Sequence, residues 1–286
     1  MRAALLLVVA ALLTLACASS SPRATSAPAD PGTAPPNIPA STGPLTEAEF
    51  KALHELPGEA PAARAGEKIT LPGGSRAYLS LPPGPGPHPG IVVIHEWWGL
   101  NGHIEHWADR LASAGWAALA VDLYDGKVAT DRDAAMAAVK AVEPAKALAI
   151  LKDGLHFLAD DPRVQARTRA VIGWCFGGGY ALQAALEFPD LDGAIMYYGR
   201  FDPDPAKLRA IKARLLGIFG DRDPGIPTAE VLKFEAALQE AGVAATIHRY
   251  DADHAFANPS NPKYDEANAA DAWDKVLAFL TELREP

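Results

Sequence analysis

The stretch that decides the fold is residues 170–179, AVIGWCFGGG. An apolar strand leads into a glycine turn, and a helix follows. Cys175 stands at the apex in the frame Gly-x-Cys-x-Gly, with Gly173 and Gly177 on either side. These glycines leave room for the strained turn of a nucleophile elbow, with cysteine in the place of serine. A lone cysteine is more often a buried structural residue, but the flanking glycines favour a nucleophile whose thiolate the helix N-terminus stabilises.

Strand and helix patterns alternate on both sides of this stretch. The apolar runs predict strands over residues 67–71, 77–81, 90–95, 116–122, 169–174, 191–198, 215–220 and 245–250. The helical spacing predicts helices over residues 45–56, 104–114, 131–142, 144–159, 176–188, 205–213, 228–241 and 265–283. Nearly continuous apolar strands separated by helices indicate an α/β fold, a mostly parallel sheet with helices on both faces. We expect one such domain over residues 45–286.

Composition excludes several classes of protein. The chain has 286 residues, of which 49% are hydrophobic, and a formal net charge of −9. This charge argues against a nucleic-acid surface and against a polybasic membrane patch. The two cysteines, Cys17 and Cys175, lie in segments of different character, so a disulfide framework is not expected.

The first 17 residues are typical of an export signal. A positive charge at Arg2 precedes an apolar run that is too short to span a membrane. The run ends in Ala16-Cys17, which resembles a lipoprotein cleavage site and predicts a lipid on Cys17. Ordinary cleavage near Ala18 is the alternative. We expect an exported protein, either a lipoprotein on the periplasmic face of a membrane or a free periplasmic or secreted one.

Residues 18–44 are rich in Ser, Ala, Pro and Thr and predict a disordered tether.

Side chains that can act in catalysis follow several of the predicted strands, at the sheet edge where ligands bind in open α/β sheets. They occur in the order Cys175, Asp223, His254, which is the order of α/β-hydrolase triads. Cys175 would be the nucleophile and His254 the base, and Asp223 would fix the histidine tautomer. Asp221 is the rival acid.

Two backbone amides would hold the oxyanion, those of Phe176 after the nucleophile and Trp97 after an early strand. Trp98, Tyr198 and Arg200 follow the same strands, and we expect them to contact the substrate.

We expect neither a metal nor a cofactor. His103 and His106 flank Glu105, but neighbouring helical positions point in different directions, and no third ligand is evident. Residues 177–179 are three glycines, without the lysine or the spacing of a phosphate-binding loop.

The combination of motifs resembles the dienelactone hydrolase family over residues 90–283. The motifs are HEWWGLN at 95–101, DLY at 122–124, GWCFGG at 173–178, YYG at 197–199, GDRD at 220–223 and DHAF at 253–256. The resemblance implies an α/β-hydrolase fold and a triad of Cys175, Asp223 and His254. It also implies that Glu96 helps to poise the cysteine as a thiolate.

The chain departs from this family where a substrate carboxylate would be held. The family has an arginine shortly after the histidine, whereas this chain runs into Asn258. A second family arginine matches Arg132 only loosely. Arg200 is a candidate for a substitute anion clamp, and a solvated loop arginine is the alternative. Recognition of a substrate carboxylate is therefore in doubt.

Together these features predict a hydrolase that cleaves small-molecule carboxylic esters or lactones through an acyl-cysteine. A peptidase or acyltransferase on the same fold is an alternative, because fold does not fix function. A lipid-anchored, non-catalytic binding protein is another. A thiol redox sensor is disfavoured, because the expected domain has no resolving cysteine. We expect a monomer that contacts a membrane only through its anchor.

Overall fold

The structure is a computed structural model that describes residues 65–284. The predicted export signal, tether, Cys17 and helix over residues 45–56 lie outside the described residues. Within residues 65–284, no helix has the length and apolar character needed to cross a membrane.

The domain is built on an eight-stranded sheet with the strand order β1-β2-β4-β3-β5-β6-β7-β8. Strands β3 to β8 are parallel, whereas β1 and β2 form an antiparallel hairpin at one edge. The strands are β1 (Glu67–Thr70), β2 (Arg76–Ser80), β3 (Gly90–Ile94), β4 (Ala117–Val121), β5 (Arg169–Trp174), β6 (Gly193–Tyr197), β7 (Arg214–Gly220) and β8 (Ala245–Tyr250).

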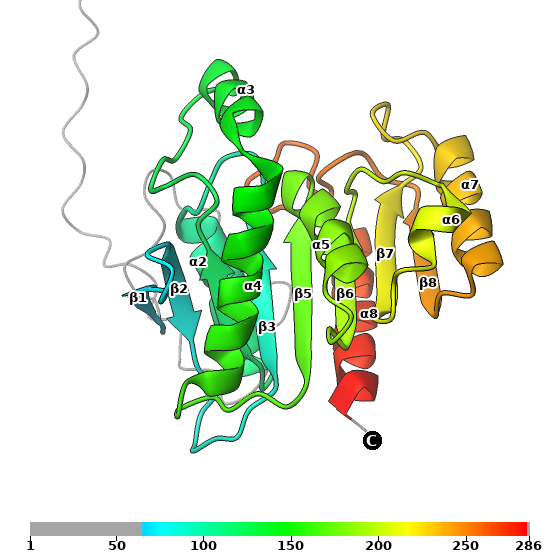
Figure 1. The fold of residues 1–286 in the computed structure, drawn as a ribbon. Coiled ribbons are helices and arrows are strands. Elements are labelled where there is room, and N and C mark those ends of the chain that lie inside the picture. Colours follow the sequence, from blue (N-terminus) through cyan, green and yellow to red (C-terminus); the bar gives the residue numbers. More distant parts are fainter. Residues whose placement is uncertain (1–64, 285–286) are drawn as a thin grey trace, which may run out of the picture. The chain divides into compact units, whose positions relative to one another are not determined.

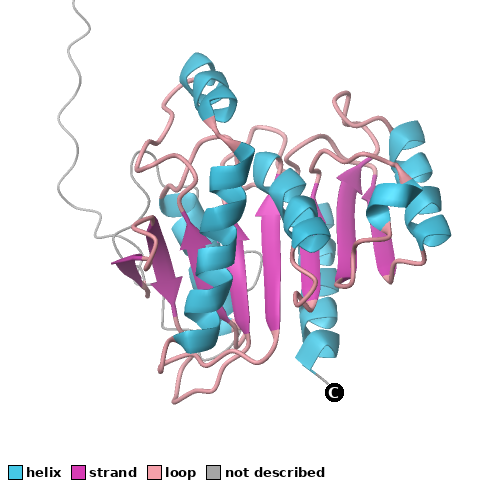
Figure 2. Ribbon diagram, viewed as in Figure 1, coloured by secondary structure: helices cyan, strands magenta, loops and turns pink. Residues whose placement is uncertain are grey.

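Helices cover both faces of this sheet (Figures 1 and 2). Helices α4 and α5 pack on one face, and α2 and α8 pack on the other. The described helices are α2 (Gly102–Ser113), α3 (Arg132–Ala141), α4 (Pro144–Asp160), α5 (Phe176–Glu187), α6 (Pro205–Leu208), α7 (Thr228–Ala241) and α8 (Glu266–Arg284). Every residue of β3, β4 and β6 is buried, which explains their unbroken apolar runs. The predicted α/β-hydrolase fold is confirmed.

Helix α6 is shorter than the sequence predicts. It ends at Leu208 instead of continuing to residue 213. The chain has to turn there to enter β7 at Arg214, and the N–H of Ile211 donates to the carbonyl of Leu208 within that turn.

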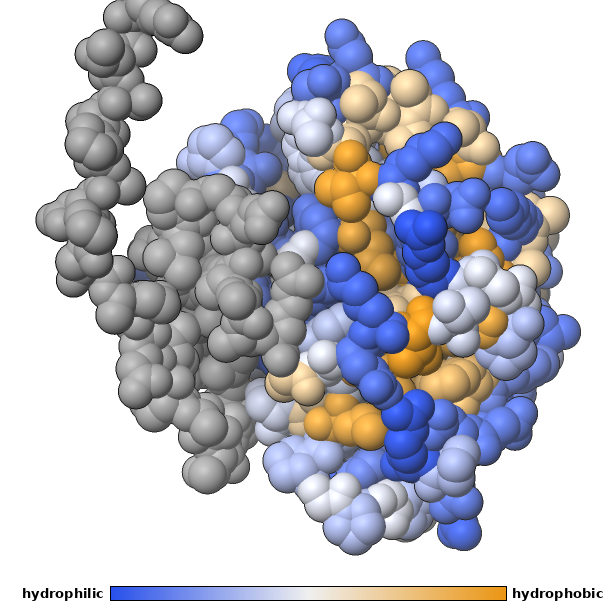
Figure 3. Space-filling model, turned by 90° about the vertical axis from the view of Figure 1, so that its left-hand side faces the viewer, coloured by the Kyte–Doolittle hydropathy of each residue, from blue (hydrophilic) through white to orange (hydrophobic). Residues whose placement is uncertain are grey.

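The surface seen from the β1 side carries hydrophobic residues in a broken band between hydrophilic ones (Figure 3).

Candidate functional site

Cys175 lies between the end of β5 and the start of α5, as the elbow pattern predicts. Its φ of 53° and ψ of −112° place it in a conformation that side-chain-bearing residues rarely adopt. The turn is possible because glycines flank it. A Cβ at Gly173 would collide with the backbone of Gly177, and one at Gly177 would collide with the carbonyl of Ile94. Strain of this kind is concentrated at functional sites.

The parallel register brings two further strand ends to Cys175. Ile94 of β3 lies opposite Gly173 of β5, so Glu96 and Cys175 each follow two residues beyond a paired position. On the other side, the N–H of Cys175 donates to the carbonyl of Tyr197 at 3.0 Å. Tyr198, the next residue, is buried with a φ of 35°. Glu96 and Tyr198 therefore flank the strand end that carries the thiol.

His254 connects the acid to the thiol. Its Nδ1 lies 2.5 Å from Oδ2 of Asp223, and the Cys175 side chain is close enough to its ring to raise the pKa of the imidazole. The histidine side chain is 34% exposed, whereas that of Asp223 is 2% exposed. The N–H of Gly225 donates to the other Asp223 oxygen at 2.8 Å. The structure thus brings together the three residues that the chain order singled out.

These contacts favour a protonated His254 beside an ionised Asp223. Burial lowers the pKa of His254, but the hydrogen bonds to Asp223 and Cys175 outweigh this effect and raise the pKa to about 10. Burial raises the pKa of Asp223, but the hydrogen bond and charge of His254 and nearby backbone amides bring it below its usual value. An imidazolium next to a carboxylate is a suitable counter-ion for a thiolate.

Glu96 is held by the loop that follows His254. It is 7% exposed, and its Oε2 accepts a hydrogen bond of 2.6 Å from Nδ2 of Asn258. Burial raises the pKa of Glu96 to about 7, although Asn258 and the charge of His254 act in the opposite direction. A carboxyl group with this pKa can take up or release a proton near neutral pH.

His95 is a structural residue. It is fully buried, its Nδ1 lies 2.6 Å from the carbonyl oxygen of Glu96, and its Nε2 lies 3.2 Å from the backbone nitrogen of Leu123. Burial lowers its pKa to about 4, so the ring is neutral. His95 therefore fixes the end of β3 against the segment after β4 and helps to place Glu96.

The predicted oxyanion groups lie on neighbouring strand ends. Trp97 and Phe176 are each three residues beyond the paired positions of β3 and β5. The N–H of Phe176 belongs to the first turn of α5, where amides have no acceptor within the helix.

The structure places only some of the residues predicted to contact the substrate at this site. Trp98 lines a cleft of about 270 Å³ together with Glu96 and Asn258. The Tyr198 ring lies 5.0 Å from the ring of His254. In contrast, Arg200 and Arg132 are exposed and line neither this cleft nor the larger one described next. Asp221, the rival acid, pairs with Arg249 instead of His254.

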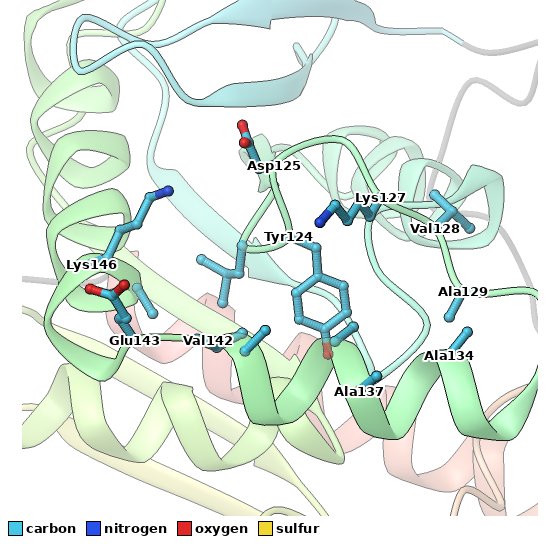
Figure 4. Close-up of a pocket in the computed structure, with 14 residues that line it drawn as sticks. Tyr124, Asp125, Lys127, Val128, Ala129, Ala134, Ala137, Val142, Glu143 and Lys146 are labelled. Carbon is cyan, nitrogen blue, oxygen red and sulfur yellow. The ribbon is translucent and has the colours of Figure 1, made fainter.

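A larger cleft of about 680 Å³ lies between residues 123–129, helix α3 and the start of α4 (Figure 4). Sequence reasoning missed this cleft and its wall residue Tyr124, although it singled out the DLY motif. It also missed Asn258 as the partner of Glu96. The only signal in the sequence was the asparagine in the place of the family arginine.

Comparisons with known proteins agree with each other. A sequence model described as the dienelactone hydrolase family matches residues 75–283. Protein usf of Aquifex pyrophilus is 34% identical over 218 residues, which cover 72% of this chain and 93% of that protein. The "Putative carboxymethylenebutenolidase" of Methylorubrum extorquens is 30% identical over 221 residues, which cover 72% of this chain and 76% of that protein. The crystal structure of a "Putative Dienelactone Hydrolase" from Klebsiella pneumoniae aligns with a TM-score of 0.71 and 28% identity, over 76% of this chain and 98% of that chain.

Proposed function

The chain belongs to the dienelactone hydrolase family of hydrolases, and we propose that it cleaves carboxylic esters or lactones through an acyl-cysteine on Cys175. The observation that carries this proposal is the position of His254, which contacts Asp223 through Nδ1 and interacts with the Cys175 side chain at the elbow. Nucleophile, base and orienting acid in this arrangement are the parts that acyl transfer requires.

The first half of the reaction forms the acyl-enzyme. The thiolate of Cys175 attacks the carbonyl carbon and forms a carbon–sulfur bond, and the carbonyl oxygen takes the negative charge. The N–H groups of Phe176 and Trp97 stabilise this oxyanion. When the intermediate collapses, the carbon–oxygen bond of the ester breaks, and the leaving oxygen receives the proton of the His254 imidazolium.

The second half returns the enzyme to its starting state. His254 is now neutral and takes a proton from a water molecule, whose oxygen attacks the thioester carbon. The carbon–sulfur bond breaks, the carboxylic acid leaves and Cys175 is again a thiolate beside the imidazolium. Asp223 keeps the tautomer of His254 fixed throughout.

Glu96 would act before this cycle. When the thiol is protonated, an ionised Glu96 that turns from Asn258 toward Cys175 can accept the proton. A hydrogen bond to a neutral side chain leaves that carboxylate available, which supports this role.

The sulfur favours certain substrates. Because a thiol is a stronger acid than an alcohol, a thiolate leaves a tetrahedral intermediate more readily than an alkoxide does. Productive turnover then needs a good leaving group, which enol lactones, aryl esters and thioesters have and amides lack. This preference disfavours the peptidase alternative.

The test is turnover of a panel of aryl esters, lactones and thioesters by the wild type and by Cys175→Ala, with the melting temperature as a check on folding. We expect the variant to lose ester cleavage and keep its fold. Mass spectrometry of a rapidly quenched reaction should show one acyl group on the peptide that contains Cys175. Near wild-type turnover by the variant would overturn the proposal, and turnover of no substrate by the wild type would favour a binding protein.

A further inference from the structure

The large cleft has a wall of small apolar side chains. Four alanines of α3 contribute to the lining together with Ala129 of the loop before it, and the volume of about 680 Å³ lies in the range of ~300–1,000 Å³ that small-molecule sites occupy. The space between the loop and the helix is thus open because α3 presents methyl groups where larger side chains would fill it.

Tyr124 joins this cleft to the thiol. Figure 4 shows its ring extending from the loop toward α3. The same ring lies 5.5 Å from that of Phe176, the residue after Cys175, and the charge of Cys175 acts on its hydroxyl group. The Tyr124 hydroxyl is buried and has no hydrogen-bond partner among residues 65–284. One side chain therefore forms both the wall of the cleft and part of the surroundings of the nucleophile.

The charges around the cleft cancel. Lys127 and Lys146 line it together with Asp125 and Glu143, all four exposed. No arginine belongs to the described lining, and Arg132 of α3 is outside it. Because the two lysines are offset by two carboxylates, the lining has no excess of positive charge to pair with a substrate carboxylate, and it favours an uncharged group. The nearby Val128 and Met136 are two of the exposed large hydrophobic residues of the described chain.

We propose that this cleft binds the apolar chain of an uncharged ester whose scissile carbonyl lies at Cys175, and that Tyr124 forms the shared wall. The proposal rests on the proposed ester hydrolysis and names its substrate class. Burial of each methylene in the cleft adds transition-state binding, which corresponds to about a fourfold gain in kcat/KM per methylene until the cleft is filled.

Two series of esters test this class. In the first, nitrophenyl esters carry acyl chains from acetate to octanoate; in the second, alkyl thioesters of acetic acid carry chains of matched length on the leaving group. We expect kcat/KM to rise with chain length in one series, which identifies the side of the scissile bond that enters the cleft. Nitrophenyl esters whose acyl chain ends in a carboxylate should be poorer substrates than uncharged esters of equal length.

Filling the cleft should remove the gain. Ala138→Phe places a ring from α3 into the cleft, and Ala137→Phe does the same from an exposed position that folding tolerates more easily. We expect either variant to lower the ratio of long-chain to short-chain kcat/KM by about tenfold or more. Ala145→Phe is the matched control, because Ala145 is exposed on α4 and does not line the cleft; it should keep the ratio.

Different experimental results would overturn the cleft assignment and the proposed ester hydrolysis. Cys175-dependent hydrolysis with no chain-length gain in either series would overturn the cleft assignment and leave ester hydrolysis intact. A gain that both folded phenylalanine variants retain would also overturn it, as would a preference for the carboxylate-bearing esters. Ester cleavage that does not depend on Cys175 would instead overturn the proposed function.

Discussion

Asn258 donates a hydrogen bond from Nδ2 to Oε2 of Glu96 at 2.6 Å and thereby joins residues 162 positions apart in the sequence. The contact connects the loop after β8, which also carries His254, to the end of β3. Because Asn258 is neutral, it fixes the carboxyl group without supplying an opposite charge. Burial therefore remains the largest influence and raises the pKa of Glu96 to about 7.

The first prediction concerns the acid limb of the pH profile. Glu96 accepts a proton only when it is ionised, so kcat/KM should fall as the pH drops below about 7. Asn258→Arg adds a positive charge that favours the ionised form and should shift this limb to lower pH. Asn258→Leu removes the hydrogen bond that lowers the pKa and should shift the limb to higher pH. The measurement is kcat/KM for an aryl ester against pH.

Ala267→Arg serves as the control, because it adds the same charge at an exposed position on α8. It should leave the acid limb in place. If the two Asn258 variants also leave the limb in place, Glu96 is not the group that titrates there.

The second prediction separates two ways to ionise Cys175. If Glu96 takes the thiol proton, Glu96→Gln keeps the size of the side chain and loses the base, so kcat/KM should fall by ~10²-fold or more. The pH dependence of iodoacetamide labelling at Cys175 should shift in the same variant. If rate and labelling both stay at wild-type values, His254 alone ionises the thiol, and Glu96 is a structural loop residue.

The third prediction tests the sulfur itself. Cys175→Ser keeps the elbow but supplies a hydroxyl that stays protonated next to His254, because the site provides a counter-ion for a thiolate and not a strong base for an alcohol. We expect kcat/KM to fall by about 10²-fold or more while the melting temperature stays unchanged. A serine variant with wild-type turnover would show that the site was not arranged around a thiolate.

Much of the fold could be predicted because its strands are buried on both faces. Strand β3 contains only apolar residues and glycine, as residues 90–94, GIVVI, show, and this pattern has few alternatives. The elbow could also be predicted from the sequence, because only glycine at positions 173 and 177 avoids a collision with backbone atoms in the turn. The order of Cys175, Asp223 and His254 along the chain then placed the three groups at one sheet edge.

The remaining features depend on contacts that local patterns do not encode. The bond between Glu96 and Asn258 needs the loop after β8 to cross to β3, and no spacing rule predicts it. The large cleft depends on how α3 lies over the loop that carries Tyr124, and alanines in a helix carry no directional signal of their own. Arg132 and Arg200 were candidate anion contacts by position, but the structure leaves both exposed.

The fourth prediction concerns the N-terminus, which lies outside the described residues. An apolar run that ends in Ala16-Cys17 and is followed by a polar tether predicts lipid attachment at Cys17. The wild type should fractionate with membranes, and Cys17→Ser should not be lipidated and should leave the washed membrane fraction. A serine variant as firmly membrane-bound as the wild type would rule out this anchor and favour ordinary cleavage near Ala18.

The last prediction concerns two adjacent glycines of α5 that have different surroundings. A Cβ at Gly178 would lie 2.5 Å from the carbonyl oxygen of Tyr197, whereas a Cβ at Gly179 would have its nearest neighbour, the carbonyl oxygen of Arg200, at 3.5 Å. Gly178→Ala therefore has to push α5 away from β6, and overpacking of this kind costs about 1–3 kcal/mol. Gly179→Ala meets no collision and should stabilise the helix by up to ~1 kcal/mol. Urea unfolding of both variants measures the difference. Since α5 begins directly after Cys175, Gly178→Ala should also reduce ester turnover. Equal stabilities of the two variants would show that α5 does not pack against the end of β6 as closely as these distances require.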